Sequence, residues 1–483
     1  MDQGKGDEDD IAARYFAFAQ QFLTFSDEET DGVTTEAAAA ASVLNIMGVA
    51  ARAIGEEDEE MSDAEETPVW GGSSPGKAPN KSRDFSGAHK KLVEQYFSGE
   101  ASIYNEVDFE RRFRMPRSVF NRIYDALVQQ AVPPFVQKYC TFANKPGITP
   151  LCRLVACLRK ICYGDADDRE DEYLQISETV VNESVKAFTR LIVEKFGSEY
   201  LNRCPSEAEK KRALAMMSKR HFPGAFGAWD CKHFVWKNCP VYLQGQHKGH
   251  AEGGKKTLIL EAIADCDGYI WYVFFGEPGS LNDLNVLDKS SIVSGILTGD
   301  FNLRVDPYTI NGRQRDWLYF LVDGIYTAWT IFVKPLLAPM NERELAFNVE
   351  QEAARKCVER VFGQVIAQFE SLAKPIRHWD TEDIQYLLYC CIILHNMVTA
   401  ERRAAFLDGD VDMPLLGEDE EEDEEHNGNG LSLFGYQQMP FDPLVTTLLG
   451  HRVTNMQGNI EDHAEHDRLM ADLIEHVWAA TQH

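Results

Sequence analysis

Three acidic residues that are far apart in the sequence stand where they could share a metal site. Asp230 lies in the β-rich segment GAWDCKH, Asp323 ends the apolar segment YFLVD, and Glu359 lies in the helical pattern KCVERVFG. Carboxylates at strand ends and on a packing helix can converge, and the mouth of a sheet is where α/β proteins bind ligands. An Asp after a strand is more often a turn former or a helix cap than a ligand, so spacing alone does not establish the site.

Three carboxylates without a His or Cys ligand would favour hard cations such as Mg²⁺ or Mn²⁺ over zinc. Two such ions would activate water or a 3′-hydroxyl and stabilise the leaving oxygen of a phosphoryl displacement. Asp283, in GSLNDLNVL, could bind metal or position substrate in a supporting role, or it could cap the helix that begins there.

His233 follows Asp230 in the same segment, and we expect it on the same face of the strand. There it would lie beside the metal site or contact phosphate; a core histidine is an equally good account. Four lysines flank the first strands, and QGQHKGHAEGGKK forms a Gly-rich basic loop suited to contacts with the DNA backbone, or simply a solvated hairpin tip. The four are Lys237, Lys248, Lys255 and Lys256.

A sheet with packed helices is needed to bring the carboxylates together. Residues 216–400 contain the apolar patterns of both strands and helices. Three β-rich segments come first, the last two joined by the turn dipeptide Asp267-Gly268. A helix, a buried strand and two more helices follow, an order expected of an RNase H-like α/β fold. We predict strands at 225–236, 257–266, 269–276 and 317–323, and helices at 282–297, 343–370 and 383–400. We expect a mixed five-stranded sheet with flanking helices, and interpret His395-Asn396 as packing residues.

Residues 81–215 have the pattern of an α-helical domain, with helices near 88–97, 115–130 and 151–163. A short element ending at Ile176 and a helical period over 180–196 suggest a helix-turn-helix. The second of these helices offers only Asn182, Lys186 and Arg190 as DNA-reading side chains. A plain helical hairpin is therefore nearly as good an account.

The net charge of -29 is concentrated in the two ends of the chain. Residues 1–66 carry 18 acidic and 3 basic side chains, residues 401–483 carry 19 and 4, and the middle is balanced at +1. The acidity therefore does not exclude nucleic-acid binding by the middle. We predict that residues 1–80 are disordered, and that 401–483 form an acidic linker and a helix from about 461 to 480.

The cysteines and the N-terminus bear on the compartment. None of the 11 cysteines forms a CxxC pair, and their odd number suits reduced, intracellular thiols. The first ten residues are acidic and lack the apolar core of a secretory signal. Ala37–Ile54 is apolar but contains Arg52, so we expect no membrane span.

Seven blocks between Ser82 and Met397 resemble the PIF/Harbinger family of transposases, in the plant-transposon-protein group with its DDE-superfamily nuclease domain. They are YFSGEASIYNEVDFERRFRM, YGDADDREDEYLQISE, GAFGAWDCKHFVWKNCP, FFGEPGSLNDLNVLD, YFLVDGIY, VERVFG and CIILHNM. No general physical constraint would reproduce all of them in order. By motif, the family's DDE triad falls on Asp230, Asp323 and Glu359. The resemblance implies an RNase H-like core, a divalent-metal requirement, and DNA cleavage and strand transfer at transposon ends.

The resemblance also implies partners. Harbinger-type transposases typically work with a separate Myb-like DNA-binding protein, so we expect such a partner, a nuclear location and an oligomer of unspecified size. The three intact carboxylates favour an active nuclease. A domesticated or inactive relative that associates with DNA or chromatin without cutting would keep them as well.

Overall fold

The computed structural model describes residues 81–140, 145–166, 168–249, 251–407 and 460–482. From Ser82 onward these residues belong to one compact unit. The predicted disorder of residues 1–80, the apolar segment Ala37–Ile54 and most of the acidic linker lie outside the described residues. Within the described residues, we find no helix with the length and apolarity that a bilayer crossing requires.

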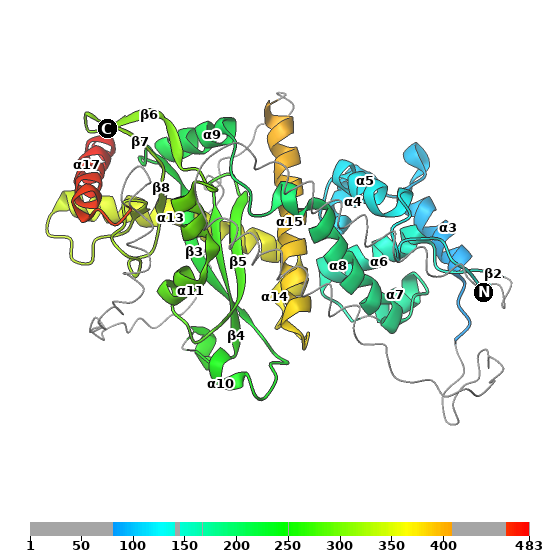
Figure 1. Cartoon of the computed structure of the whole chain (residues 1–483). Coiled ribbons are helices and arrows are strands. Elements are labelled where there is room, and N and C mark those ends of the chain that lie inside the picture. The colour runs from blue at the N-terminus through cyan, green and yellow to red at the C-terminus, as the bar shows by residue number, and fades with distance from the viewer. Residues whose placement is uncertain (1–80, 141–144, 167, 250, 408–459, 483) are drawn as a thin grey trace, which may run out of the picture. The chain divides into compact units, whose positions relative to one another are not determined.

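A mixed five-stranded sheet forms the centre of the unit, as predicted (Figure 1). Its spatial order is β5-β4-β3-β8-β9. Within this sheet, β4 pairs antiparallel with both β3 and β5, whereas β8 and β9 run parallel to β3. Their bounds are β3 (Ala225–Val235), β4 (Thr257–Ala264), β5 (Ile270–Pro278), β8 (Tyr319–Leu321) and β9 (Phe332–Val333). The turn predicted at Asp267-Gly268 does join β4 to β5, and Gly268 there has a φ of 87°.

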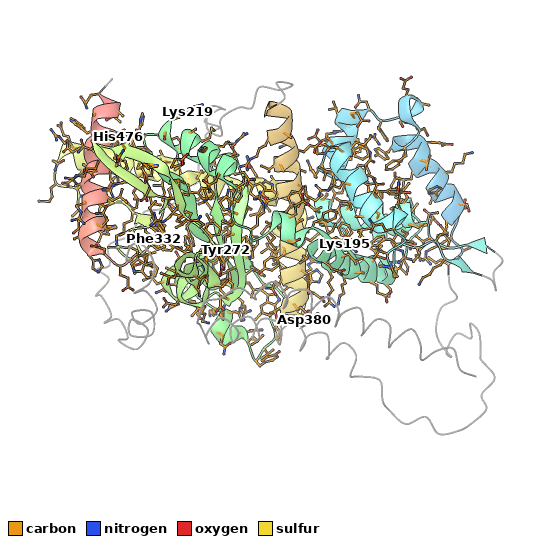
Figure 2. All side chains as sticks on the ribbon, turned by 45° about the horizontal axis from the view of Figure 1, so that its top comes forward. Lys195, Lys219, Tyr272, Phe332, Asp380 and His476 are labelled. Carbon is orange, nitrogen blue, oxygen red and sulfur yellow. The ribbon has the colours of Figure 1, made fainter. Side chains whose placement is uncertain are left out.

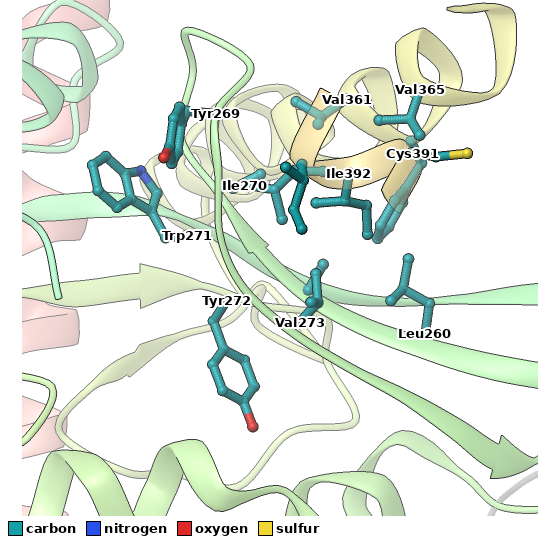
Figure 3. Packing of buried hydrophobic residues seen from close by; sticks show 14 of the residues in the cluster. Leu260, Tyr269, Ile270, Trp271, Tyr272, Val273, Val361, Val365, Cys391 and Ile392 are labelled. Atoms are coloured by element: carbon teal, nitrogen blue, oxygen red, sulfur yellow. The ribbon is translucent and has the colours of Figure 1, made fainter. Parts of the chain in front are cut away.

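Helices cover both faces of this sheet. On one face, Leu260 and Val273 pack against α13 (Glu342–Gln368) and α15 (Thr381–Leu407), which contribute residues such as Val361 (Figure 3). On the other face lie α11 (Asp283–Lys289) and α12 (Ser291–Thr298), where the Tyr272 hydroxyl lies 3.0 Å from that of Ser290. All eight residues of β4 are buried, as expected of a strand covered on both sides. Side chains fill the space between the layers, and Tyr272 and Phe332 are among those buried there (Figure 2).

A set of helices precedes the sheet in the chain. They are α3 (Phe85–Tyr96), α4 (Glu106–Phe113), α5 (Arg117–Tyr124), α6 (Pro150–Tyr163), α7 (Asp168–Tyr173), α8 (Glu178–Tyr200) and α9 (Glu207–Ser218). Helix α6 begins as predicted, with Pro150 in its first turn and the Thr149 side chain capping it. The long α8 packs against α6 and α15, so α15 lies between α8 and the sheet (Figure 1).

Asn396 on α15 joins these layers. Its buried amide accepts a hydrogen bond from the Ile270 N–H of β5 (3.0 Å) and donates to the Tyr200 carbonyl of α8 (2.8 Å). This confirms the packing role expected of His395-Asn396, since His395 is buried and hydrogen-bonded too.

A DNA-reading function for α8 is not confirmed. Lys186 and Arg190, two of its three candidate reader residues, form ion pairs with Asp383 at the start of α15, at 2.7 Å and 3.4 Å. A recognition helix must present its basic side chains to a groove. Here these two side chains instead tie α8 to its neighbour.

Two elements extend the fold beyond the sheet. β6 (Arg304–Ile310) and β7 (Arg313–Trp317) form a separate antiparallel hairpin that the sequence pattern did not predict. The predicted terminal helix is present as α17 (His463–Thr481), and it packs against α13 and the β6-β7 hairpin. Leu469, Leu473 and Val477 on α17 recur at helical spacing and are buried. This helix therefore completes the core although about fifty residues separate it from α15.

Candidate active site

The parallel pairing of β3 and β8 brings Asp230 and Asp323 together. Ala228 pairs with Leu321, so the same register continued by two residues sets Asp230 level with Asp323. Because side chains alternate along a strand, both carboxylates then lie on the same face of the sheet. Asp323 lies two residues after the end of β8, where the chain leaves the sheet, and its carboxylate accepts a hydrogen bond from the Gly324 N–H (2.6 Å).

Helix α13 carries the third carboxylate to that face. The helix begins at the Asn341 cap, and its buried Val358, Val361 and Val365 pack toward the sheet. Glu359 is adjacent to this buried stripe and its side chain is 47% exposed. The structure therefore places all three predicted triad residues on the same side of the sheet, although 129 positions separate Asp230 from Glu359.

Arg355 lies among these carboxylates. One guanidinium nitrogen is 3.1 Å from an Asp230 oxygen and another is 2.7 Å from a Glu359 oxygen. Asp323 also interacts with it electrostatically, and the three anions together raise the pKa of Arg355 against the effect of its burial. A single cationic side chain thus links the predicted triad.

Burial dominates the electrostatics of Asp230. Desolvation raises the pKa of its carboxyl to about 6, with Asp283 and Glu359 adding to the rise. Arg355 and the Cys231 N–H, which donates a hydrogen bond of 2.9 Å, act in the opposite direction. The carboxyl of Asp230 is therefore harder to ionise than that of an exposed aspartate, and Arg355 offsets part of the effect of burial.

Asp283 lies in the first turn of α11, on the other side of the sheet from α13. The hypothesis that it caps this helix is wrong, because the Asn282 side chain is the cap and accepts a hydrogen bond from the Asn285 N–H (2.9 Å). Burial raises the pKa of Asp283, and both Asp323 and Asp230 interact with it electrostatically. The supporting role of Asp283 stays a prediction, and its interactions with Asp230 and Asp323 place it close to two of the three carboxylates.

His233 does not share a face with Asp230, contrary to the expectation. The two are three residues apart, so they point to opposite faces of a regular strand. The His233 ring instead lies 2.9 Å from the Thr257 hydroxyl, on the Asp283 side of the sheet. Burial lowers the pKa of His233, with Asp283 opposing the shift. A direct role beside the three carboxylates is therefore not supported by its position.

The four candidate DNA-binding lysines lie toward the far end of β3. Lys237 follows Asp230 by seven residues, or about 20 Å of extended chain. Lys237, Lys248 and Lys255 are exposed and Lys256 is half-buried. Their loop is anchored at Gly279–Ser280, where the Ser280 N–H donates to the Gln246 carbonyl, and this turn leads into Asp283. They are accessible to a DNA backbone but do not surround the carboxylates.

The donor set suits a hard divalent cation, since it offers carboxylate oxygens alone. Within the described residues, however, no three acidic, His or Cys side chains already stand close enough to hold one ion together. Asp230 and Glu359 are instead held by Arg355. The residues fit the metal in kind, and Asp230, Asp323 and Glu359 are the ones that would hold it.

Two residues of this region were missed by the sequence patterns. Arg355 stands four positions before Glu359, so the helical spacing of an ion pair was a usable signal. Glu261 on β4 is fully buried opposite Cys231, in a run of apolar residues where no pattern marked it. Neither of its carboxylate oxygens has a hydrogen-bond partner among the described residues.

Glu261 makes the stability depend on pH. Burial raises its pKa to about 7, and the nearby Ser290 hydroxyl and Trp229 indole only partly oppose this. The folded state then binds the proton more tightly than the unfolded state, so stability falls as the pH rises from about 4.5 to about 7. We expect Glu261→Gln to raise the free energy of unfolding by about 3 kcal/mol at pH 8 and to have little effect at pH 4. Urea denaturation at both pH values measures this, with the exposed Glu194→Gln on α8 as a control; an equal effect at the two pH values would contradict it.

Comparison with known protein families places the site in context. The family model described as plant transposon protein matches residues 198–405, which contain all three carboxylates and Arg355. A domain of unknown function, DUF8418, matches residues 89–128.

Individual proteins are also similar to this chain. "Putative nuclease HARBI1" of Homo sapiens is 24% identical over 257 residues, covering 52% of this chain and 68% of the human protein. Its Mus musculus counterpart is 25% identical over 287 residues, covering 57% and 75%. "Protein ALP1-like" of Arabidopsis thaliana is 22% identical over 300 residues, covering 60% and 70%. No solved structure matches the chain.

Proposed function

Because residues 198–405 match the plant transposon protein family and the similar proteins include putative nucleases, we propose that this chain is a Harbinger-derived, divalent-metal-dependent DNA endonuclease of the DDE transposase type. Its substrate would be DNA at transposon ends, and its products would come from cutting and joining phosphodiester bonds. The observation that carries the proposal is the convergence of Asp230, Asp323 and Glu359 on one face of the sheet around Arg355.

The sheet order supports an RNase H-like core for this function. Three antiparallel strands followed by two strands parallel to the first, with the carboxylates on β3, after β8 and on α13, is the arrangement that such a core requires. A pair of Mg²⁺ or Mn²⁺ ions would supply charge stabilisation at the attacking and leaving oxygens. The chain itself fixes Asp230 within the rigid sheet, and leaves Asp323 and Glu359 exposed toward solvent, where a DNA backbone can approach.

Recognition of the DNA sequence is assigned to a partner in this proposal. The middle of the chain has a net charge near zero, and Lys186 and Arg190 of α8 are engaged by Asp383. A separate Myb-like protein would read the sequence, while Lys237, Lys248, Lys255 and Lys256 would contact phosphates without specificity. Both proteins would act in the nucleus, where the substrate is.

Metal removal tests the enzymatic proposal directly. The purified full chain is incubated with supercoiled plasmid in Mg²⁺, in Mn²⁺ and with excess EDTA, and nicked and linear products are measured on a gel. We expect cleavage with either metal, none with EDTA, and recovery on adding excess Mg²⁺, because the carboxylates alone supply no Lewis acid. Cleavage that persists in EDTA would contradict the proposal.

A second candidate function is favoured by the ion pairs of Arg355. A domesticated relative that associates with DNA or chromatin without cutting would tolerate a permanent internal cation between Asp230 and Glu359. DNA binding in a gel-shift assay without nicking in Mg²⁺ or Mn²⁺ would support this candidate over the nuclease.

A further inference from the structure

We propose that Arg355 is an internal counter-ion that holds the carboxylate site closed until a divalent metal displaces it. The inference rests on the proposed function, since it assigns the metal to the same three carboxylates. It adds that metal binding is a competition within the site, and that one side chain sets its strength.

The geometry favours competition. The guanidinium nitrogens of Arg355 lie 3.1 Å from Asp230 and 2.7 Å from Glu359, so they occupy the oxygens that a metal would take. The side chains of Arg355 and Asp230 are only 16% and 15% exposed, so water screens their interaction weakly. A metal ion at these oxygens and the guanidinium would be like charges that compete for the same acceptors.

The position of Arg355 makes it suitable for displacement. It projects from α13 one helical turn before Glu359, and its partner Glu359 is 47% exposed, so half of the bridge opens directly to solvent. Arginine keeps its charge at any physiological pH, so loss of the Arg355 proton cannot open the bridge. The bridge is therefore opened by another cation or by loss of the charge of a carboxylate partner.

The site also needs such a cation when no metal is present. Asp230, Asp323, Glu359 and Asp283 interact as like charges, and Asp230 is largely buried among them. Removing Arg355 would leave these anions uncompensated, which disfavours the metal-free fold. The same change would raise the affinity for a divalent ion, because the ion would replace nothing.

The test measures Mn²⁺ binding by isothermal titration calorimetry, and thermal unfolding with and without Mn²⁺, on the full chain. We expect Arg355→Gln to bind Mn²⁺ about tenfold more tightly than wild type, which corresponds to ~1.4 kcal/mol. Without metal, Arg355→Gln should unfold at a lower temperature than wild type. Adding Mn²⁺ should raise its unfolding temperature by more than that of wild type. Lys356→Gln is the matched control, since it removes the same charge from the adjacent, exposed position of α13. It should leave both measurements near wild type.

The outcomes separate this inference from the proposed function. Equal Mn²⁺ affinity in wild type, Arg355→Gln and Lys356→Gln overturns the counter-ion, and the metal site stands if Asp230→Asn abolishes that binding. If Arg355→Gln binds Mn²⁺ and wild type does not, the result supports Arg355 as a counter-ion that excludes the metal. Failure of every variant and of wild type to bind Mn²⁺ overturns both. Arg355→Lys keeps a charge and a folded site, and we expect an affinity between those of wild type and Arg355→Gln.

Discussion

Replacing Asp230 by Asn is expected to lower metal-dependent DNA cleavage by at least about 10²-fold, since even residues that only support metal ligands cost 10- to 100-fold when mutated. Asp230 is the carboxylate that the sheet fixes most firmly, through β3 pairing on both sides and the Cys231 N–H. The amide keeps the size of the side chain and can still accept from this N–H, so the fold should survive. Rates of plasmid nicking at saturating Mg²⁺ measure the effect.

Asp323→Asn and Glu359→Gln should show losses of similar size if the three act as a unit. The control is Glu352→Gln, which removes an exposed carboxylate from the same helix two turns before Glu359. Its cleavage rate should match wild type. Nicking by Asp230→Asn within about threefold of wild type, with circular dichroism showing a folded protein, would exclude Asp230 from the site.

The largest expected loss of stability comes from Asp265→Ala, which should lower the free energy of unfolding by about 3–5 kcal/mol. Asp265 is buried at the end of β4, and both of its oxygens accept from Arg403 of α15 at 2.6 and 2.7 Å. It also accepts from the Tyr269 N–H (3.1 Å) and the Trp271 indole (2.8 Å). Truncation would leave the buried Arg403 guanidinium with only the more distant Asp267 carboxylate (3.6 Å), and the Tyr269 N–H and Trp271 indole without their acceptor. Equilibrium urea unfolding measures the loss.

An exposed ion pair provides the comparison. Arg304 and Asp316 on the β6-β7 hairpin are 2.7 Å apart but exposed, so Asp316→Ala should cost no more than about 1 kcal/mol. The double variant Asp265→Ala/Arg403→Leu should recover part of the loss, because it removes the stranded charge as well. A cost for Asp265→Ala equal to that of Asp316→Ala would mean that the buried pair contributes no more than a surface pair.

The periodic spacing of apolar residues was sufficient to predict most of the strands and the helix that position the triad. β3, β4, β5 and α13 have runs of apolar residues long enough to define a strand or a helix, and the predicted ranges overlap the observed ones. β9 is two residues long and depends on pairing with β8, which no local pattern reveals. The β6-β7 hairpin was not predicted for another reason. Its strands are largely exposed and polar, and only a few side chains, such as Tyr308 and Ile310, pack against the core.

Within the site, the positions of the carboxylates were easier to predict than their surroundings. Asp323 follows a strand and Glu359 lies on a helix, so their approach to one another follows from the fold. The face of His233 was misjudged by one residue, and in a strand one residue reverses the side chain. The bridge from Arg355 to Asp230 joins residues 125 positions apart, and only tertiary packing brings them into contact.

Because α17 packs against α13, the folded unit extends beyond the segment that matches the family. The match to plant transposon proteins ends at residue 405, yet Leu473 and Val477 of α17 are fully buried in the core, where α17 packs against α13. A protein truncated where sequence relatedness ends would expose an apolar strip along α13, the helix that carries Glu359 and Arg355. For recombinant work, the segment that matches the family and the segment that must be made to obtain a stable protein are therefore different lengths of chain.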